Sequence, residues 1–248
     1  MTAMNDERLS VVTGAAGVLG TAVARQLVAE GHRVVMMDVA VDRLEARASE
    51  VGAAAVPVVV DVSDPDAVER ACQTIRNQHG TVDTLVNNAG ILSNNKAEGT
   101  SVDEWRRVLA VNLDSAFYLI RALLPGMRRQ RWGRVVNVCS LAMKSGGLTA
   151  GTAYTASKGG LGALTFSLAR EVAAEGITVN GVAPAYIRTP MVTEQLTEVQ
   201  REALLRQIPV GRFCEPEEVA RLVAFLVSPH AGFITGEIID INGGLHMD

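Results

Sequence analysis

The sequence has little of what marks several large classes of protein. Of its 248 residues only 4 % are aromatic and three are cysteine, and 23 Lys and Arg against 27 Asp and Glu give a net charge of −4. A slightly acidic chain without a block of like charge lacks the basic patch that holds nucleic acid or an anionic membrane surface. We therefore expect neither a nucleic-acid partner nor a membrane partner.

The scarcity of cysteine also limits the chemistry. Cys72, Cys139 and Cys214 lie far apart, with no CxxC pair and no histidine at metal spacing. Such usage argues against a disulfide framework or a metal site and favours a reducing compartment. The segment Met1–Leu9 has no apolar core of a signal peptide, and no apolar run approaches the roughly 20 residues of a membrane span. These observations predict a cytoplasmic protein.

Short β-rich runs alternate with longer amphipathic stretches along the chain. The strand candidates, rich in Val, Ile and Leu, are Leu9–Thr13, Arg33–Asp38, Val56–Val60, Thr84–Asn87, Arg134–Cys139, Thr178–Val182 and Glu237–Ile241. The helix candidates, with apolar residues at helical spacing, are Leu19–Glu30, Asp42–Val51, Asp64–Gln78, Val102–Arg129, Ala153–Glu175, Thr189–Gln207 and Pro216–Val227.

This alternation predicts an α/β fold. Strands separated by helices pair in parallel through right-handed crossovers, and near-continuous apolar strands suit a sheet covered on both faces. We expect a doubly wound Rossmann sheet of seven strands, with ligands at the carboxyl ends of the strands. No linker or repeat interrupts the pattern, so residues 1–248 are predicted to form a single dinucleotide-binding and catalytic domain.

A glycine-rich turn follows the first predicted strand. It reads Thr13-Gly14-Ala15-Ala16-Gly17-Val18-Leu19-Gly20 and leads into a predicted helix. Glycines let the backbone approach a pyrophosphate, and the helix N-terminus offers free N–H groups and positive potential. A turn of this kind also occurs without any ligand. The residues predicted to hold the phosphates of a dinucleotide are Gly14, Gly17, Val18, Leu19 and Gly20.

Asp38 ends the second predicted strand, 18 residues after Gly20. An acid at this place can accept hydrogen bonds from both ribose hydroxyls of NAD and repels the 2′-phosphate of NADP. The glycine turn contains no arginine, and the first one after Asp38 is Arg43. The pattern predicts NAD as the cofactor, with NADP less favoured. The alternative is an aspartate that merely begins a turn.

Tyr154 and Lys158 stand four residues apart at the start of a predicted helix, so they share a helix face. An ordinary phenol has a pKa near 10 and is about one part in a thousand ionised at pH 7, but a nearby ammonium favours the phenolate. Tyr154 is thus a candidate general acid and base for an alcohol or ketone. The alternative is a surface packing pair.

Ser140 follows a predicted strand, 14 residues before Tyr154. A hydroxyl at the carboxyl end of a strand can hydrogen-bond a substrate oxygen, and we predict that Ser140 orients the substrate in this way. By itself, a serine in such a place is more often a helix cap or a turn residue.

These features together resemble the short-chain dehydrogenase/reductase family, in its shorter, single-domain branch. The resemblance covers nearly the whole chain. Three further motifs follow the family's order: Asn87-Asn88-Ala89-Gly90, Pro184-Ala185-Tyr186-Ile187-Arg188-Thr189-Pro190 and Asn242-Gly243-Gly244.

The resemblance implies roles for further residues. Asn112 matches the asparagine whose backbone carbonyl holds a water that extends a proton relay from the lysine, and Lys158 would also bind the nicotinamide ribose. Asp61 and Val62 resemble the pair that contacts adenine. Without the family, Asp61 is more simply a turn acid and Asn112 a solvated helix residue. The remaining cofactor residues implied by the family are Asn88, Ala89 and Gly90 on the ribose side, and Pro184, Ala185, Ile187 and Thr189 beside the nicotinamide.

The sequence departs from the family pattern in three places. Gly17 and Val18 shift the middle glycine of the turn by one position, and Ala185 stands where glycine is usual. The interval from Ser140 to Tyr154 is one residue longer than the usual interval, so the loop 141–153 carries an extra residue. Because this loop borders the substrate, substrate preference is the property that the resemblance defines least.

Three functions stay open. The leading hypothesis is an NAD-dependent oxidoreductase that transfers hydride between a secondary alcohol or ketone and the nicotinamide. The runner-up is the reduction of a 3-oxoacyl thioester in fatty-acid synthesis, which usually uses NADPH and against which Asp38 argues. A basic docking patch for its phosphopantetheine carrier is not evident, although one could form from Lys96, Arg128, Arg129, Arg131 and Arg134. The third is a nicotinamide-binding regulator without turnover, against which the intact Ser, Tyr and Lys set argues.

The substrate is expected between the loop 140–153 and the segment Thr189–Gln207, which is predicted to close like a lid. Candidate pocket residues are Ser93, Met143, Tyr186 and Met191. The resemblance also implies a homotetramer, with interfaces at Val102–Leu124, Ala153–Glu175 and the last strand.

Overall fold

A single parallel sheet organises the computed structural model, which describes residues 8–189 and 197–247. The strand order is β3-β2-β1-β4-β5-β6-β7, and every neighbouring pair is parallel. The strands are β1 (Leu9–Thr13), β2 (Arg33–Asp38), β3 (Ala55–Val59), β4 (Thr84–Asn87), β5 (Gly133–Val138), β6 (Ile177–Pro184) and β7 (Ile238–Ile241). The predicted seven-stranded Rossmann sheet is confirmed, with strand ends shifted by at most two residues.

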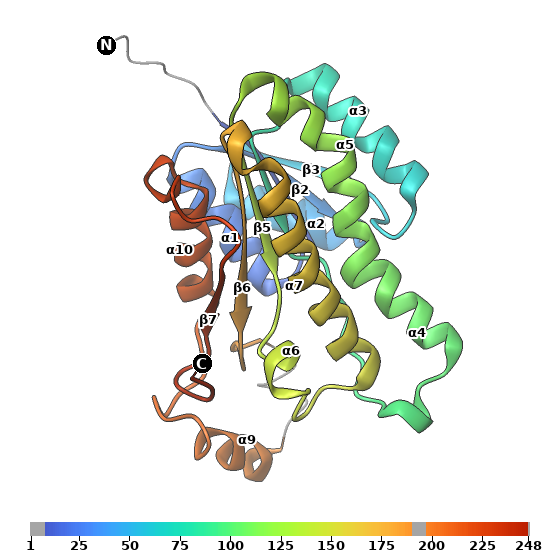
Figure 1. Ribbon diagram of the computed structural model, residues 1–248, viewed down its shortest axis with the longest axis vertical. Helices are drawn as coiled ribbons and strands as arrows, with labels where there is room; N and C mark the ends of the chain where they lie inside the picture. Colours follow the sequence, from blue (N-terminus) through green and yellow to red (C-terminus); the bar gives the residue numbers. More distant parts are fainter. Residues whose placement is uncertain (1–7, 190–196, 248) are drawn as a thin grey trace.

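Helices cover both faces of this sheet (Figure 1). On one face lie α1 (Val18–Ala29), α2 (Val41–Val51) and α10 (Pro216–Val227). On the other lie α3 (Pro65–His79), α5 (Ser115–Gln130) and α7 (Thr152–Val172). Three further helices, α4 (Val102–Leu109), α6 (Ala142–Ser145) and α9 (Glu198–Leu205), lie toward the end of the molecule where the strands finish.

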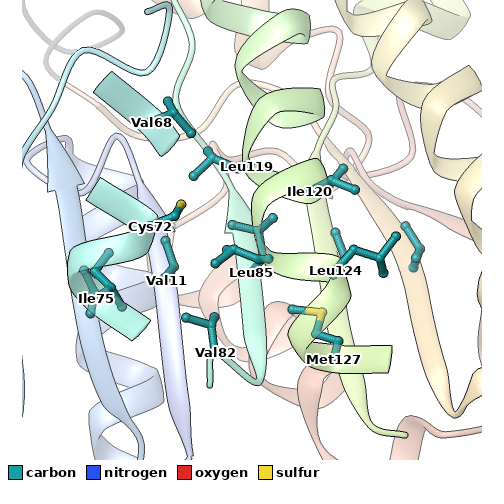
Figure 2. Packing of buried hydrophobic residues seen from close by; sticks show 14 of the residues in the cluster. Val11, Val68, Cys72, Ile75, Val82, Leu85, Leu119, Ile120, Leu124 and Met127 are labelled. Carbon is teal, nitrogen blue, oxygen red and sulfur yellow. The ribbon is translucent and has the colours of Figure 1, made fainter. Parts of the chain in front are cut away.

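Each face has its own core. Val11 of β1 belongs to the α3–α5–α7 core, whereas its neighbour Val12 belongs to the α1–α2–α10 core. In Figure 2 the side chains of Ile75, Leu119 and Met127 reach from α3 and α5 toward the strands, and all three are at most 1 % exposed. Consecutive residues of one strand are therefore buried on opposite faces, which explains the near-continuous apolar strands.

A long helical rod runs from α4 through the π-helical segment η2 (Ala110–Asp114) into α5. By length and composition this rod, Val102–Gln130, could cross a membrane, so the expectation that no segment reaches that length is wrong. Half of its most apolar part is buried inside the protein, where Leu119 and Leu123 belong to the sheet core. Burial against α3 and the sheet accounts for its apolar character without a membrane.

The predicted helices are confirmed with two qualifications. Of the segment Thr189–Gln207, the described residues form the helix α9, and residues 190–196, including Met191, lie outside the described part of the chain. The predicted helix Ala153–Glu175 begins one residue earlier, and its last turn is the 3₁₀ helix η3 (Ala173–Glu175). The four-residue α6 was not predicted, because so short a helix has no recognisable period.

Candidate active site

A cavity of about 350 Å³ opens at the carboxyl ends of β4, β5 and β6. Its walls bring together residues that are far apart in the sequence. They include Ser140, Tyr154 and Lys158 of the predicted catalytic set, and seven of the predicted cofactor residues also line it: Leu19, Asn88, Gly90, Pro184, Ala185, Ile187 and Thr189.

The glycine turn places three free N–H groups beside this edge. Gly17 is the N-cap of α1, and Thr21 is the first residue of the helix whose N–H reaches back to it, at 2.9 Å from the Gly17 oxygen. The N–H groups of Val18, Leu19 and Gly20 therefore stand at the open end of α1, where the helix dipole is positive and no acidic side chain occupies the first turn. This arrangement suits a pyrophosphate.

Two glycines of the turn are required by geometry, and the third is not. Gly14 has φ +63°, and a Cβ there would lie 2.9 Å from Ala89 Cα. A Cβ on Gly20 would overlap the Gly14 carbonyl oxygen and come within 2.8 Å of Ala15 Cα. Gly17 has an ordinary extended backbone, with only one contact for a Cβ, at 3.3 Å. The displaced glycine thus leaves the turn itself intact.

Asp38 ends β2 directly beside the glycine turn. Its Oδ2 accepts the Ala16 N–H at 3.1 Å and its Oδ1 accepts the Ala40 N–H at 3.0 Å. A carboxylate offers about four acceptor positions, so each oxygen can take one more donor, as two ribose hydroxyls would provide. Asp38 is a turn residue, as the alternative interpretation proposed, because it accepts the Ala40 N–H. It also accepts the Ala16 N–H, which that interpretation does not explain.

The segment after β4 is tied to the same turn. Asn88 donates its side-chain amide to the carbonyls of Thr13 and Gly14, and Thr13 Oγ1 accepts the N–H groups of Asn88 and Ala89. Gly90 leaves a gap above the catalytic residues, since a Cβ there would lie 3.5 Å from both Asn112 Oδ1 and Lys158 Nζ. Thr13 was not among the predicted site residues, although it begins the glycine motif.

Asp61 lies just beyond the end of β3 and binds its own chain. Ser63 donates both its hydroxyl and its N–H to Asp61 Oδ1, at 2.7 and 2.9 Å, and these bonds are the main reason why the pKa of Asp61 is lowered. Val62 is buried in the sheet core at 7 % exposure. The turn-acid reading of Asp61 therefore holds, and contact of Asp61 and Val62 with adenine stays a prediction.

The catalytic pair lies at the start of α7. Lys158 is 3 % exposed, donates to the Val138 carbonyl at 2.7 Å, and places its ammonium 5.8 Å from the centre of the Tyr154 ring. Tyr154 is only partly buried, as a residue that meets a substrate must be. The surface-pair alternative is therefore wrong, because the ammonium is held in the interior and beside the ring.

Ser140 stands where β5 gives way to α6. Its Oγ accepts the Ala142 N–H at 3.1 Å, so it does act as a turn residue, as the simpler interpretation proposed. The hydroxyl hydrogen is not used in that bond and can be donated. Ser140 shares the cavity with Tyr154, which leaves it available to a substrate oxygen.

Asn112 is 1 % exposed and sits in the π-helical segment of the long rod. Its Oδ1 accepts the Ile91 N–H, and its Nδ2 donates to the Ile91 carbonyl and to Ser157 Oγ. Ser157 in turn donates to the Tyr154 carbonyl. The alternative of a solvated helix residue is wrong, since Asn112 ties β4 to the catalytic helix. Its π-helical setting is common at functional sites, and the water-holding role stays a prediction.

The substrate side of the cavity is lined by the loop 141–153 and by the chain after β6. Of the pocket candidates, Tyr186 lines the cavity, with a left-handed φ of +47°. Ser93 does not line it, because its hydroxyl is bound to Glu104, and Met143 instead packs over Gly162 and the small core below. Met191 lies outside the described residues.

The suggested basic patch does not exist as a unit. Lys96 binds two carbonyls of the loop 141–153, at the carboxyl edge of the sheet. Arg128 pairs with Glu171 and Glu175 at the end of α5, which lies at the opposite end of the molecule from α6 (Figure 1). Arg134 is 5 % exposed and bonded to backbone carbonyls. The predicted patch depended only on the number of basic residues in the sequence, which does not show whether they are neighbours in the fold.

The three cysteines are free thiols with little reactivity. Burial raises the pKa of Cys72 to about 12 and that of Cys139 to about 11, so neither is a thiolate at neutral pH. Within residues 8–189 and 197–247 no group of three His, Cys, Asp or Glu side chains is arranged to hold a metal ion.

A sequence profile described as Enoyl-(Acyl carrier protein) reductase matches residues 14–246, which include the glycine turn and all four predicted catalytic residues. The chain belongs to the short-chain dehydrogenase/reductase family. It is an oxidoreductase that acts on a CH–OH group, and membership of the family implies a nicotinamide cofactor. The free N–H groups at the start of α1 and the absence of a side chain at Gly90, which lines the cavity, fit such a group.

Relatives of known name are similar over nearly their whole length. The 3-oxoacyl-(acyl-carrier-protein) reductase FabG of Vibrio cholerae is 40 % identical over 241 residues, 97 % of this chain and 98 % of that protein. The proteins of the same name from Escherichia coli K12 and Pseudomonas aeruginosa are also 40 % identical, over 98 % and 97 % of this chain. They cover 100 % and 98 % of those two proteins.

Proposed function

We propose that this short-chain dehydrogenase/reductase reduces the 3-oxo group of an acyl thioester to a 3-hydroxy group, with NADH as the hydride donor. The observation that carries the reaction type is the shared cavity of Ser140, Tyr154 and Lys158 beside the glycine turn. The thioester is favoured by the 40 % identical relatives, whose names state that substrate. Because of these relatives we favour the 3-oxoacyl thioester, the runner-up substrate of the sequence analysis, over a free secondary alcohol.

The choice of NADH over NADPH depends on Asp38. Its carboxylate accepts two backbone N–H groups and lies next to the glycine turn. A 2′-phosphate at that place would meet a fixed like charge, whereas a 2′-hydroxyl would meet an acceptor. We therefore retain NAD(H) from the leading hypothesis, and with it the roles of the predicted cofactor residues.

The residues of the chain supply the proton and the orientation. When bound, the nicotinamide provides or accepts the hydride. The Ser140 hydroxyl donates a hydrogen bond to the substrate oxygen, and Tyr154 gives its phenolic proton to that oxygen as hydride reaches the carbonyl carbon. The ammonium of Lys158 stabilises the phenolate left behind. In the oxidative direction, Tyr154 takes the alcohol proton instead.

Asn112 helps to position the catalytic residues of α7. It binds Ile91 in the segment after β4 and, through Ser157, the first turn of α7. We propose that it also supports the water through which the phenolate regains its proton. The second candidate, oxidation of a free secondary alcohol with NAD, is favoured by the separation of Lys96 from Arg128 and Arg134, which do not form a joined basic docking patch.

We further propose that residues 1–248 act as one domain, that the protein is cytoplasmic, and that it forms a homotetramer. Support for the tetramer comes from large apolar side chains left exposed on the rod α4–α5, on α7 and near the C-terminus. These are Val102, Trp105, Phe117, Phe166, Phe233 and Met247.

The test is the absorbance of reduced nicotinamide with purified protein. NADH and NADPH are each offered with 3-oxobutanoyl thioesters of coenzyme A and of an acyl-carrier protein, and NAD with a panel of secondary alcohols at mildly alkaline pH. Turnover of the thioesters with NADH supports the proposal. Turnover only of alcohols with NAD would favour the second candidate, and a preference for NADPH would overturn the argument from Asp38. Bound NADH without any turnover would indicate the non-catalytic regulator.

A further inference from the structure

The outer wall of the substrate cavity is a short turn with a weak backbone. Leu148, Thr149 and Ala150 line the cavity, and Leu148 is 64 % exposed. The turn begins with Gly146 and Gly147, which both have φ +74°. Two consecutive glycines make this turn costly to order, because glycine loses more conformational freedom on ordering than any other residue. This wall therefore needs an external support.

Lys96 provides that support from another part of the chain. Its Nζ donates to the Gly147 carbonyl at 3.0 Å and to the Ala150 carbonyl at 2.7 Å. One ammonium thus bridges both ends of the stretch that contains Leu148 and Thr149. Hydrogen bonds from a charged donor are about twice as strong as neutral ones. Among the described residues no carboxylate forms an ion pair with Lys96, so these carbonyls are its partners.

The backbone around Lys96 continues the same contact. Gly151 donates its N–H to the Ser93 carbonyl at 2.6 Å, and Thr152 donates to the Asn95 carbonyl at 3.0 Å. Gly151 is the N-cap of α7 and directly precedes the first turn of that helix, which carries Tyr154. The segment 93–96 is therefore bonded to the substrate wall and to the start of the catalytic helix at the same time.

Glu104 of α4 holds this segment in place. Its two carboxylate oxygens accept hydrogen bonds from Ser93 Oγ and from Asn95 Nδ2, the latter at 2.8 Å. These two bonds are the main reason why the pKa of Glu104 is lowered, which keeps the carboxylate ionised and accepting at neutral pH. The support therefore reaches from α4 through segment 93–96 to the substrate wall.

We propose that Lys96 is a positioning residue that fixes the wall 147–150 and thereby determines which substrates fit beside Tyr154. The inference deepens the proposed function and depends on it for the identity of the substrate. It assigns a role to a lysine that contacts neither the reacting atoms nor the cofactor residues.

The test compares Lys96→Met with the parent protein. Methionine keeps the unbranched side chain, one atom shorter, and removes the donors. We expect the KM for the 3-oxobutanoyl thioester to rise about tenfold while kcat stays within about twofold, and a bulkier 3-oxoacyl thioester to lose less. Hydrogen–deuterium exchange should become faster in the peptide that contains Gly151 and Thr152, with unchanged affinity for NADH. Lys96→Arg, which retains the donors, should restore most of both readouts.

The matched control is Arg106→Met, which removes an exposed positive charge from α4 outside the cavity and should change neither KM nor exchange. Unchanged KM and unchanged exchange in Lys96→Met would overturn the proposal. Equal losses of kcat, of NADH affinity and of melting temperature would also overturn it, since they would indicate a general loss of structure. If the parent turns over no thioester while exchange still accelerates in Lys96→Met, the proposed function fails and the support of the wall by Lys96 stands.

Discussion

The dinucleotide half of the site and the substrate half are held by different kinds of contact. In the first, short side chains at the strand ends bind the backbone of the adjoining glycine turn: Asn88 donates to the Thr13 and Gly14 carbonyls, and Asp38 accepts the Ala16 N–H. In the second, charged side chains hold loops from a distance: Lys96 binds the wall 147–150, and Lys144 pairs with Asp240 at 2.8 Å. A substitution in the glycine turn therefore disturbs closely packed backbone, whereas a substitution of Lys96 removes a support without adding a clash.

The largest effect should come from Tyr154→Phe, where the two halves meet. Loss of the phenolic proton donor should lower kcat about 10³-fold, within the range for general acid–base groups. NADH affinity should stay within about threefold of the parent value, because the glycine turn is untouched. Single-turnover absorbance and fluorescence titration with NADH measure the two quantities. Retention of more than a tenth of kcat would remove Tyr154 from its proposed role.

Gly20→Ala should break the dinucleotide half. Its new methyl group overlaps the Gly14 carbonyl, which cannot move because Gly14 is itself packed against Ala89. We expect about 100-fold weaker NADH binding and a lower melting temperature, since overpacking of this kind costs about 1–3 kcal/mol. Gly17→Ala is the matched control, because its φ is ordinary and its methyl group would meet the Gly14 carbonyl oxygen at 3.3 Å, a tight contact that a shift of a few tenths of an ångström relieves. Equal effects of the two substitutions would contradict this account of the turn.

Asp38→Asn should change cofactor preference and leave the substrate half as it is. The shape is kept and the charge is lost, so NADH affinity should fall about tenfold while NADPH affinity rises. Asp42→Asn, on the exposed side of α2, is the charge-matched control and should change neither affinity. Isothermal titration with both cofactors provides the measurement. An unchanged ratio of the two affinities would show that Asp38 does not face the ribose.

Glu104→Gln should produce the smallest effect, limited to the substrate half. The amide keeps one acceptor oxygen but replaces the other with a donor, so one of the bonds from Ser93 and Asn95 is lost. We expect KM to rise about two- to threefold with kcat and NADH affinity unchanged. Steady-state kinetics at neutral pH checks this.

The same carboxylate predicts a pH dependence of the wall. Because the pKa of Glu104 is lowered in the folded protein, its stabilising bonds are present at neutral pH and are lost only as the pH falls through that lowered pKa. Hydrogen exchange of the peptide containing Gly151 and Thr152 should therefore show no excess opening between neutral pH and about pH 5. Faster opening within that range, corrected for intrinsic exchange, would contradict the assignment.

Local sequence determined the fold and the dinucleotide half. The seven strands, the glycine turn with its required Gly14 and Gly20, and the four-residue spacing of Tyr154 and Lys158 follow from periodicity, from steric freedom and from helix geometry. Each is encoded by residues close together in the chain, so pattern and spacing were sufficient. The family resemblance added Asn112, whose burial no local pattern indicated.

Only the tertiary structure decided the substrate half. Lys96 and Gly147 are 51 residues apart, and Lys144 and Asp240 are 96 apart, so no local period connects them. Charge counting grouped Lys96 with arginines that lie at the other end of the sheet. The prediction of the pocket from the loop sequence named Ser93 and Met143, which do not line the cavity. Residues so far apart in the chain become partners only when the strands and helices bring their backbones together, and the local sequence does not specify that arrangement.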